Sequence, residues 1–357
     1  MLSDTYTQEA IELLKALIAI PSFSKEEDCT AELLNQWLSN RKIPTERIGN
    51  NIIARNKYFS HEKKSLLLNS HHDTVSPNKN YTKDPFTPFI EEGKLFGLGS
   101  NDAGGCLVSL MATFLHFYEV QDLAFNIIFI ASAEEEISGK NGIELALSLV
   151  HNIEVAIVGE PTQMQMAVAE RGLMVVDCEA KGVAGHAARK EGDNALYKAI
   201  KDIEWIQSYR FDKVSELLGE STMSVTIIET DNKQHNVVPA SCKFVIDVRC
   251  NELYSFEEII SELENNLISE VTPRSMRLRS TSIPLQHPLV QAGISLGRNY
   301  YGSPTTSDKA LMPFPALKIG PGDSARSHTA DEFIYIEEIR QGIDMYINLI
   351  KLFTRNH

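Results

Sequence analysis

The chain has 357 residues, 43% hydrophobic and 23% charged, which is typical of a globular protein large enough for two domains. No apolar run approaches the roughly 18 residues of a membrane span. The formal net charge of −14 argues against binding to a phosphate backbone, so we expect neither a membrane nor a nucleic-acid partner. The five cysteines form no CxxC pair and are odd in number, so we expect a cytoplasmic protein without a disulfide framework.

The first half of the chain alternates helical and strand patterns. Residues 1–20 have apolar side chains at helical spacing and no basic start or cleavage site of a signal peptide, so they predict an amphipathic helix. Ser24 and Glu27 have the spacing of a capping box before a second helix. We expect strands at 51–55, 65–70, 125–132 and 154–160, and a long helix at about 103–118. This alternation predicts an α/β domain with a mostly parallel mixed sheet flanked by helices.

The pattern changes between residues 171 and 281. Strand, helix, strand, strand, helix and strand follow one another there, in the order of a ferredoxin-like α+β domain. The last strand is expected in the stretch SMRLRSTS at 275–282. We therefore predict one domain made of residues 1–170 and 282–357, with a second domain at 171–281 inserted into it.

Ionisable side chains follow four apolar stretches at the point where each strand is expected to end. They are His71, His72, Asp73, Glu134, Glu135, Glu136, Glu160 and His328. Asp102 lies between glycines at the start of the long helix. Because ligands of open α/β sheets collect outside the carboxyl ends of the strands, we expect these groups to form one site.

The kinds of side chain in this set indicate a metal. Imidazole and carboxylate groups without a thiolate suit zinc, for which cobalt or manganese can substitute. Two histidines and three carboxylates fit two ions about 3.5–4 Å apart that share a bridging carboxylate, which we assign to Asp102. Strand alternation places His71 and Asp73 on one face and His72 on the other. We therefore expect His71 to bind metal and Asp73 to orient it.

Seven motifs, five of which contain these residues, occur in an order that resembles one known family. They are SHHDTV, GLGSNDAGG, AEEEISG, VGEPT, GVAGHAA, NVVPASCKFVIDVR and GPGDSARSHTADEF. The family is that of acetylornithine deacetylase and succinyl-diaminopimelate desuccinylase, which are dinuclear zinc metallohydrolases with a zinc-exopeptidase-like fold. The ligands that the resemblance implies are His71 and Glu160 for one zinc, Glu136 and His328 for the other, and Asp102 as the bridge, with a cis peptide bond to Ala103.

The resemblance also assigns roles around the metals. It makes Glu135 the general base, although the choice between Glu134 and Glu135 depends on one position of the match. It makes the inserted domain a lid and dimerisation domain, whose His186 reaches into the partner's site of a homodimer and polarises the scissile carbonyl. The substrate-binding residues that it implies are Arg171, Asn236, Arg249 and Gly322.

The implied reaction is the removal of an acetyl or succinyl group from an N-acyl-L-ornithine, in arginine biosynthesis. Arg171 matches an arginine of the desuccinylases, so a succinyl-diaminopimelate desuccinylase is the first alternative, and a dipeptidase or aminoacylase is the next. A succinyl group needs a further cation, for which Arg171, Arg249 and Arg326 are candidates. A metal-binding scaffold without activity is disfavoured because all five ligands and the base are present.

Overall fold

The computed structural model describes residues 2–189 and 191–355, which form two compact units. Unit 1 consists of Met1–Val168, Ile283–Tyr301 and Ser307–His357, and unit 2 consists of Ala169–Ser282 and Gly302–Thr306. The last of these segments differs from our expectation, which placed it in the first domain. It belongs to unit 2 because Arg171 N donates to Ser303 O at 3.2 Å and Thr306 Oγ1 donates to Arg171 O at 3.1 Å.

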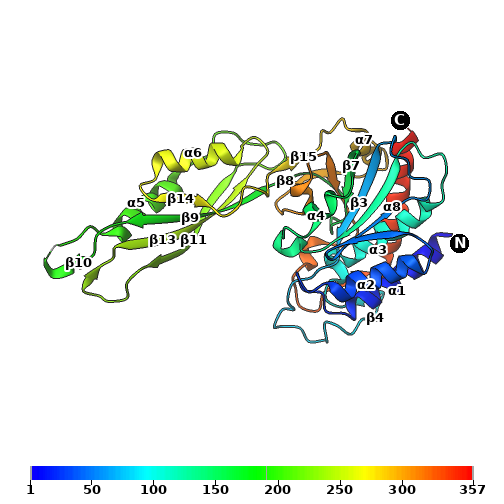
Figure 1. Ribbon diagram of the computed structural model, residues 1–357, viewed down its shortest axis with the longest axis horizontal. Helices are drawn as coiled ribbons and strands as arrows, with labels where there is room; N and C mark the ends of the chain where they lie inside the picture. The colour runs from blue at the N-terminus through cyan, green and yellow to red at the C-terminus, as the bar shows by residue number, and fades with distance from the viewer. Residues whose placement is uncertain (1, 190, 356–357) are drawn as a thin grey trace. The chain divides into compact units, whose positions relative to one another are not determined.

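The largest sheet is mixed, and most of its residues belong to unit 1, whereas residues 169–170, 281–282 and 302–303 of its strands belong to unit 2 (Figure 1). Its strands, in sheet order, are β1 (Thr45–Ile48), β2 (Asn51–Arg55), β6 (Asn126–Ser132), β3 (Ser65–His71), β7 (Ile153–Val158), β17 (Ala316–Lys318), β8 (Met166–Glu170) and β15 (Thr281–Ser282), with β16 (Tyr300–Ser303) paired to β8. The four central strands β6, β3, β7 and β17 run parallel. Antiparallel pairs flank them, β1 and β2 on one side and β8 on the other.

Helices cover both faces of this sheet. They are α1 (Leu2–Ile18), α2 (Asp28–Ser39), α3 (Gly105–Tyr118), α4 (Ile143–Leu147), α7 (Pro288–Ser295) and α8 (Ile336–Arg355). Phe129 on β6 packs against Phe114 on α3, with ring centroids 5.9 Å apart. Ile128 and Ile130 instead join the buried cluster that contains Ile143 on α4. Since neighbouring residues of a strand point to opposite faces, α3 and α4 lie on opposite sides of the sheet.

Short elements complete unit 1. They are the three-stranded sheet of β18 (Phe333–Tyr335), β5 (Lys94–Phe96) and β4 (Phe89–Glu91), and the helical turns η1 (Ser100–Gly104), η2 (Glu135–Ile137), η4 (Asp308–Leu311) and η5 (Ser324–Arg326). Among the described residues, every helix is too short or too polar to cross a membrane.

The expected strands and the long helix are confirmed to within two residues, but the expected capping box is wrong. Helix α2 begins at Asp28, and no side chain caps its first turn. Ser24 Oγ instead donates to Asp73 Oδ2 at 2.6 Å. Glu27 Oε1 accepts from the backbone nitrogens of Lys25 at 2.7 Å and Glu134 at 3.2 Å. Both side chains therefore support loops that follow the central strands, which local spacing could not indicate.

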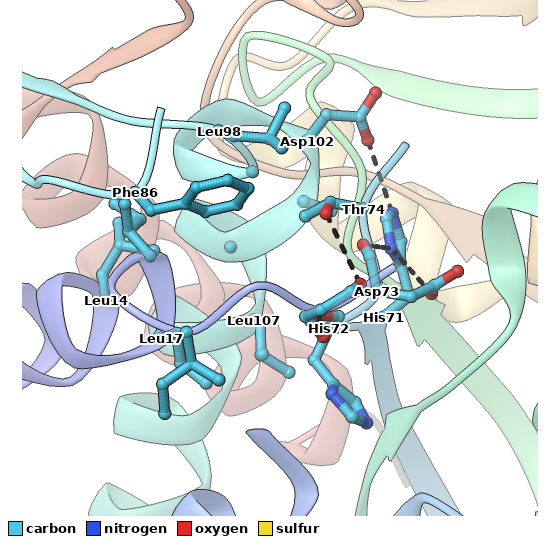
Figure 2. A pocket seen from close by; sticks show the side chains of 16 residues that line it. Leu14, Leu17, His71, His72, Asp73, Thr74, Phe86, Leu98, Asp102 and Leu107 are labelled. Atoms are coloured by element: carbon cyan, nitrogen blue, oxygen red, sulfur yellow. Dashed lines mark hydrogen bonds and ion pairs between the residues drawn. The ribbon is translucent and has the colours of Figure 1, made fainter. Parts of the chain in front are cut away.

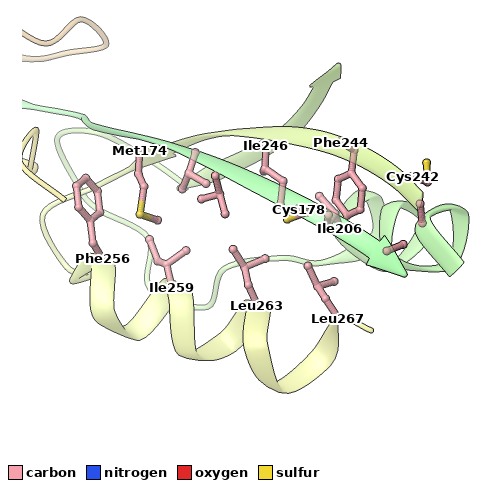
Figure 3. Close-up of a cluster of buried hydrophobic side chains, with 14 of the residues drawn as sticks. Met174, Cys178, Ile206, Cys242, Phe244, Ile246, Phe256, Ile259, Leu263 and Leu267 are labelled. Atoms are coloured by element: carbon pink, nitrogen blue, oxygen red, sulfur yellow. The ribbon is translucent and has the colours of Figure 1, made fainter. Parts of the chain in front are cut away.

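Unit 2 has the expected order of strands and helices. They are β9 (Gly172–Lys181), η3 (Ala187–Arg189), α5 (Ala195–Ser208), β11 (Thr222–Thr230), β13 (Ser241–Cys250), α6 (Phe256–Asn266) and β14 (Glu270–Pro273), with a separate pair of β10 (Gly185–His186) and β12 (Val237–Val238). The sheet order β11-β13-β9-β14, with antiparallel pairs throughout, is that of a ferredoxin-like fold. Figure 3 shows apolar side chains of α6 packed against this sheet.

The last strand of unit 2 differs from our expectation. It is β14, in which Val271 pairs with Cys178 of β9 and packs against the apolar core. The stretch 275–282 that we expected to be the strand contributes only its last two residues to a strand, β15. Its Arg279 forms an ion pair with Glu257 on the surface.

Candidate metal centre

The central parallel strands bring the site residues to one edge of the sheet. His71 is the last residue of β3, Glu135 and Glu136 follow β6, and Glu160 follows β7. His71 pairs with Ser132 in the register of β3 and β6, so the ends of these strands are level. Parallel strands present their carboxyl ends at the same edge, which explains why side chains far apart in sequence meet here.

The predicted ligands form one cluster around Asp102. His71 Nε2 lies 3.4 Å from Asp102 Oδ1 and 3.9 Å from Glu160 Oε1. His328 Nε2 lies 3.0 Å from Glu136 Oε2 and 3.7 Å from Asp102 Oδ2. The two carboxylate oxygens of Asp102 therefore face different histidines, which is the arrangement that a bridging ligand requires. The peptide bond that follows Asp102 is cis.

The cluster fits a metal on the evidence of one buried atom. His71 Nε2 is buried and has no hydrogen-bond partner among the described residues. It belongs to two groups of potential ligand atoms that lie within 4.8 Å of one another, one with Asp102 and Glu136 and one with Glu135 and Glu160. A buried nitrogen whose nearest contact is an ion pair at 3.4 Å is poorly satisfied, and a cation between it and these carboxylates would remove that cost. The described side chains therefore suit divalent metal ions.

An apolar wall lies beside the cluster. A small cavity of about 20 Å³ is bordered by His71, Asp73 and Asp102 on one side. Its apolar lining comes from Leu14, Leu17, Ile18, Phe86, Leu98 and Leu107, several of which are labelled in Figure 2. Apolar surroundings make charges harder to bury and strengthen their interaction with a cation.

Asp73 contacts both His71 and the turn η2, whose Glu135 and Glu136 make it the acidic turn of the site. His71 Nδ1 lies 3.0 Å from Asp73 O and 3.4 Å from Asp73 Oδ1. A proton on Nδ1 that is donated to this carbonyl leaves Nε2 as the metal-facing atom. Asp73 Oδ1 also accepts from Glu135 N at 3.1 Å, and Oδ2 accepts from Glu136 N at 3.2 Å. One carboxylate thus sets the positions of a ligand and of the turn that carries two further site residues.

His72 lies outside the cluster. Its Nε2 is 2.9 Å from Asn50 O and its Nδ1 is 2.9 Å from Thr30 Oγ1. Figure 2 shows its imidazole pointing away from Asp102. Burial lowers the pKa of His72, which favours the neutral ring. The geometry agrees with strand alternation, which assigned the two histidines to opposite faces.

The side chains of Glu134 and Glu135 lie in different surroundings. The carboxylate of Glu134 accepts from Asn141 Nδ2 at 3.0 Å and from Asn141 N at 3.3 Å, within its own loop. Gly139 packs against it so closely that a Cβ there would lie 1.8 Å from Glu134 Oε2. Glu135 Oε2 instead lies 4.0 Å from His71 Nε2. Of the two candidates for the base, only Glu135 reaches the cluster.

Burial and mutual repulsion dominate the proton affinities of the cluster. Burial raises the pKa of Glu135 well above its usual range, by more than His71 lowers it. The hydrogen bond with Glu136 raises the pKa of His328 to about 9. Burial is the largest single influence on Asp102 and raises its pKa, but His71, Ser327 and His328 together lower it by more, so the net pKa is lowered. Without a metal, bound protons partly neutralise the clustered carboxylates. A metal ion that binds there would displace these protons.

Sequence analysis missed two buried carboxylates beside the cluster. Glu332 accepts from three backbone nitrogens in the segment that carries Asp102. Asp308 Oδ2 accepts from Ser132 Oγ at 2.5 Å, just before the acidic turn. Burial raises the pKa of Glu332 to about 8 and that of Asp308 to about 6. The signal for Glu332 was its place in the motif GPGDSARSHTADEF, next to an apolar residue.

The remaining predicted residues fall into two places. Gly322 is in unit 1, where its φ of +90° and a Cβ only 2.6 Å from Asn101 Oδ1 both require glycine. His186 and Asn236 lie close together within unit 2, where Ala187 N donates to Asn236 O at 3.0 Å. The last two residues, Arg171 and Arg249, also belong to unit 2. The ligands and Glu135 thus form one group in unit 1, and the proposed lid residues belong to the other unit.

The fold and the cluster together define a class of protein, a metal-dependent hydrolase with an α/β domain. Residues 67–352 match the peptidase family M20/M25/M40. The chain belongs to this family. The prediction of a metal-dependent hydrolase that acts on amide bonds is confirmed.

Three similar proteins illustrate the family. The succinyl-diaminopimelate desuccinylase of Rickettsia bellii (strain OSU 85-389) is 25% identical over 372 residues, which cover 94% of this chain and 95% of that protein. A tripeptidase from Staphylococcus aureus has a TM-score of 0.78 at 19% identity, covering 98% of this chain and 99% of that chain. A dinuclear metal binding peptidase from Bacillus subtilis has a TM-score of 0.73 at 14% identity, and the match covers 98% of this chain and 99% of that chain. The solved structures confirm the predicted α/β fold with a mixed sheet flanked by helices.

Proposed function

We propose that this protein removes the succinyl group from an N-succinyl diamino acid, with succinyl-diaminopimelate as the first substrate to test. The observation that carries the proposal is the buried His71 Nε2, which faces carboxylates of both predicted metal sites. The relatives named as succinyl-diaminopimelate desuccinylases support the succinyl group. A second candidate is an N-acyl-L-ornithine deacylase of arginine biosynthesis, which the motif around His328 favours.

The proposed cofactor is a pair of zinc ions, for which cobalt or manganese could substitute. His71 and Glu160 would hold one ion, Glu136 and His328 the other, and Asp102 would bridge them. When bound, the ions would polarise the scissile carbonyl and lower the pKa of a water toward neutrality. The related dinuclear peptidase from Bacillus subtilis supports two ions.

The proposed proton transfers belong to Glu135. Its carboxylate is at the cluster, and the bond from its backbone nitrogen to Asp73 fixes the turn on which it lies. Glu135 would take a proton from the attacking water and then give it to the leaving amine, which must be protonated to depart. Removal of this side chain should therefore block turnover and leave the five ligands in place.

His186 is the proposed donor to the oxyanion, from the partner subunit. Its Nδ1 accepts from Ala188 N at 3.2 Å, so a neutral ring carries its proton on Nε2. A donor of this kind is typically worth about 3–4 kcal/mol in transition-state stabilisation. The side chain is exposed within unit 2, as a group that acts on another subunit must be.

The proposed homodimer forms through unit 2. Strand β11 is an edge strand, and its Ile227 and Ile228 are 49% and 48% exposed. Tyr197 and Ile200 on the neighbouring helix α5 are 66% and 40% exposed. An exposed edge strand with apolar side chains is a template for pairing with another strand, which supports a second copy of the chain as the partner.

Arg171 is the best candidate to bind the succinyl carboxylate. Arg326 forms two hydrogen bonds with Glu338, and Arg249 forms an ion pair with Asp247. The guanidinium of Arg171 donates to the neutral carbonyl of Leu218, so that contact leaves its charge uncompensated. A bidentate contact with a second carboxylate would satisfy this charge.

The test is a comparison of substrates. The protein is reconstituted with zinc, and amine release is measured from N-succinyl-L,L-diaminopimelate, N-succinyl-L-ornithine, N-acetyl-L-ornithine and a dipeptide, with Glu135→Ala as the blank. We expect the highest kcat/KM on a succinylated substrate and a large loss of that preference in Arg171→Ala. A clear preference for the acetyl substrate would contradict the proposal and favour the second candidate.

A further inference from the structure

Glu332 is a buried carboxylate whose bonds all lead to one short segment. Its side chain is 2% exposed. Oε1 accepts from Asn101 N at 2.8 Å and from Asp102 N at 2.9 Å, and Oε2 accepts from Gly99 N at 3.0 Å. Both oxygens bond backbone N–H groups of the metal-binding segment, and Glu332 belongs to neither group of potential metal-ligand atoms.

A second contact ties the same segment to the loop that carries His328. Asn101 Nδ2 donates to Asp323 O at 3.0 Å, and Asn101 Oδ1 accepts from Asp323 N at 3.0 Å. Glu332 follows His328 by four residues, so the two contacts enclose that histidine between them. The segment 99–102 and the loop 323–332 are therefore joined at two points, with Asp102 Oδ2 and His328 Nε2 only 3.7 Å apart.

A bridging carboxylate needs more exact placement than an ordinary ligand, because each oxygen must face a different ion. The side chain of Asp102 has few torsions, so its backbone nitrogen largely sets where its oxygens lie. Three hydrogen bonds from the same short segment to one buried side chain hold that backbone in place, because breaking them would leave backbone N–H groups unpaired.

We infer that Glu332 is a positioning residue that fixes the backbone of Asp102, so that its carboxylate can bridge two metal ions and His328 can complete the site. The inference rests on the metal site of the proposed function. The expected consequence is that Glu332 controls metal affinity without being a ligand. Loss of groups that orient metal ligands typically weakens metal binding by about 10–100-fold.

The test is Glu332→Gln, which keeps the size of the side chain but presents an NH₂ group to at least one of the three N–H groups. Metal-free protein is titrated with zinc by calorimetry, and bound metal is counted after dialysis. We expect affinity for one or both ions to fall by about 10–100-fold. Glu332→Asp, which keeps the carboxyl group on a shorter side chain, should have a zinc affinity between those of the wild type and Glu332→Gln.

The matched control is Asn126→Ala, at the opposite end of β6 from the acidic turn. Asn126 is also buried and also bonds three backbone groups, Ser60 N, Ser60 O and Lys63 O, at 2.7–3.0 Å. It should lower the melting temperature of the metal-free protein and leave zinc affinity unchanged. Comparison of this variant with Glu332→Gln distinguishes a loss of zinc affinity caused by lower stability from one caused by a displaced Asp102.

Three outcomes would overturn the inference. Wild-type zinc affinity in both Glu332 variants, with two ions bound, would overturn it and leave the proposed function standing. An equal loss of affinity in Asn126→Ala would show that general destabilisation accounts for the effect. Wild-type protein that binds no metal would overturn the inference and the proposed function together.

Discussion

The two units place their charged side chains in different ways. In unit 2, Arg274 and Asp177 form an ion pair at 2.7 Å on the surface, each about half exposed, and the buried cluster between α6 and the sheet is apolar (Figure 3). In unit 1, His71 and Asp73 are almost fully buried at the end of the central strand. Surface pairs stabilise a fold weakly, whereas a buried group of carboxylates needs a cation. The contrast supports the main sheet of unit 1 as the place of the proposed metal site.

The largest effect is expected for Glu135→Ala. It removes the proposed proton carrier and none of the five ligands, so kcat should fall by about 10²–10⁴-fold with zinc content unchanged. Steady-state kinetics and metal analysis of the same sample measure both quantities. Wild-type turnover would remove Glu135 from the mechanism. Loss of metal would mean that Glu135 is a ligand and that the roles within the acidic turn are different.

Removal of the metal by a chelator should lower the stability of the protein far more than removal of a surface charge. Metal that binds only the folded protein stabilises it by about 4 kcal/mol when present at 1,000 times its Kd. We therefore expect removal of zinc to lower the melting temperature by several degrees, and zinc to restore it, as followed by circular dichroism. Identical melting curves with and without a chelator would contradict a metal in this site.

The pH dependence of metal binding is the next effect in size. The pKa of His328 in the metal-free protein is raised to about 9, so its ring is protonated at pH 7 and must lose that proton to bind metal. Zinc affinity should therefore rise with pH, by up to about tenfold per pH unit between pH 6 and 8 for one displaced proton. Calorimetry in two buffers of different ionisation enthalpy counts the protons released.

The same shift has a consequence for the metal-free protein. The folded pKa of His328 exceeds the unfolded value of 6.5, so its pair with Glu136 contributes stability below about pH 6.5 and loses that contribution as the pH rises through about 9. For the metal-binding prediction, a zinc affinity that does not change with pH, together with no proton release, would contradict His328 as a metal ligand.

The smallest effect is expected for Arg274→Ala in unit 2. Its pair with Asp177 is exposed to solvent, so the free energy of unfolding should change by less than about 1 kcal/mol. Zinc affinity should not change at all. Denaturant unfolding and zinc titration of this variant provide the baseline for the unit 1 variants. A change in metal binding would show that a surface pair in unit 2 influences the site in unit 1.

Much of the framework followed from local sequence. Strands β2, β3, β6 and β7 and helix α3 matched their predicted ranges, because apolar runs of strand length can be buried in only a few ways. The ligand types followed from histidine and carboxylate side chains at the ends of those strands. His71 and His72 could be told apart because alternation along a strand is a local property.

Only the tertiary structure decided how those groups are held. Ser24 and Glu27 looked like a helix cap but bond to Asp73 and Glu134. The bond from Asn101 N to Glu332 joins residues 231 positions apart. No local pattern specifies such a partner, because it is fixed by which loops the folded sheet brings to the same edge. The sequence by itself determined the strands and the chemical types of the ligands, and long-range packing determined which carboxylates face the metals and which hold the backbone around them.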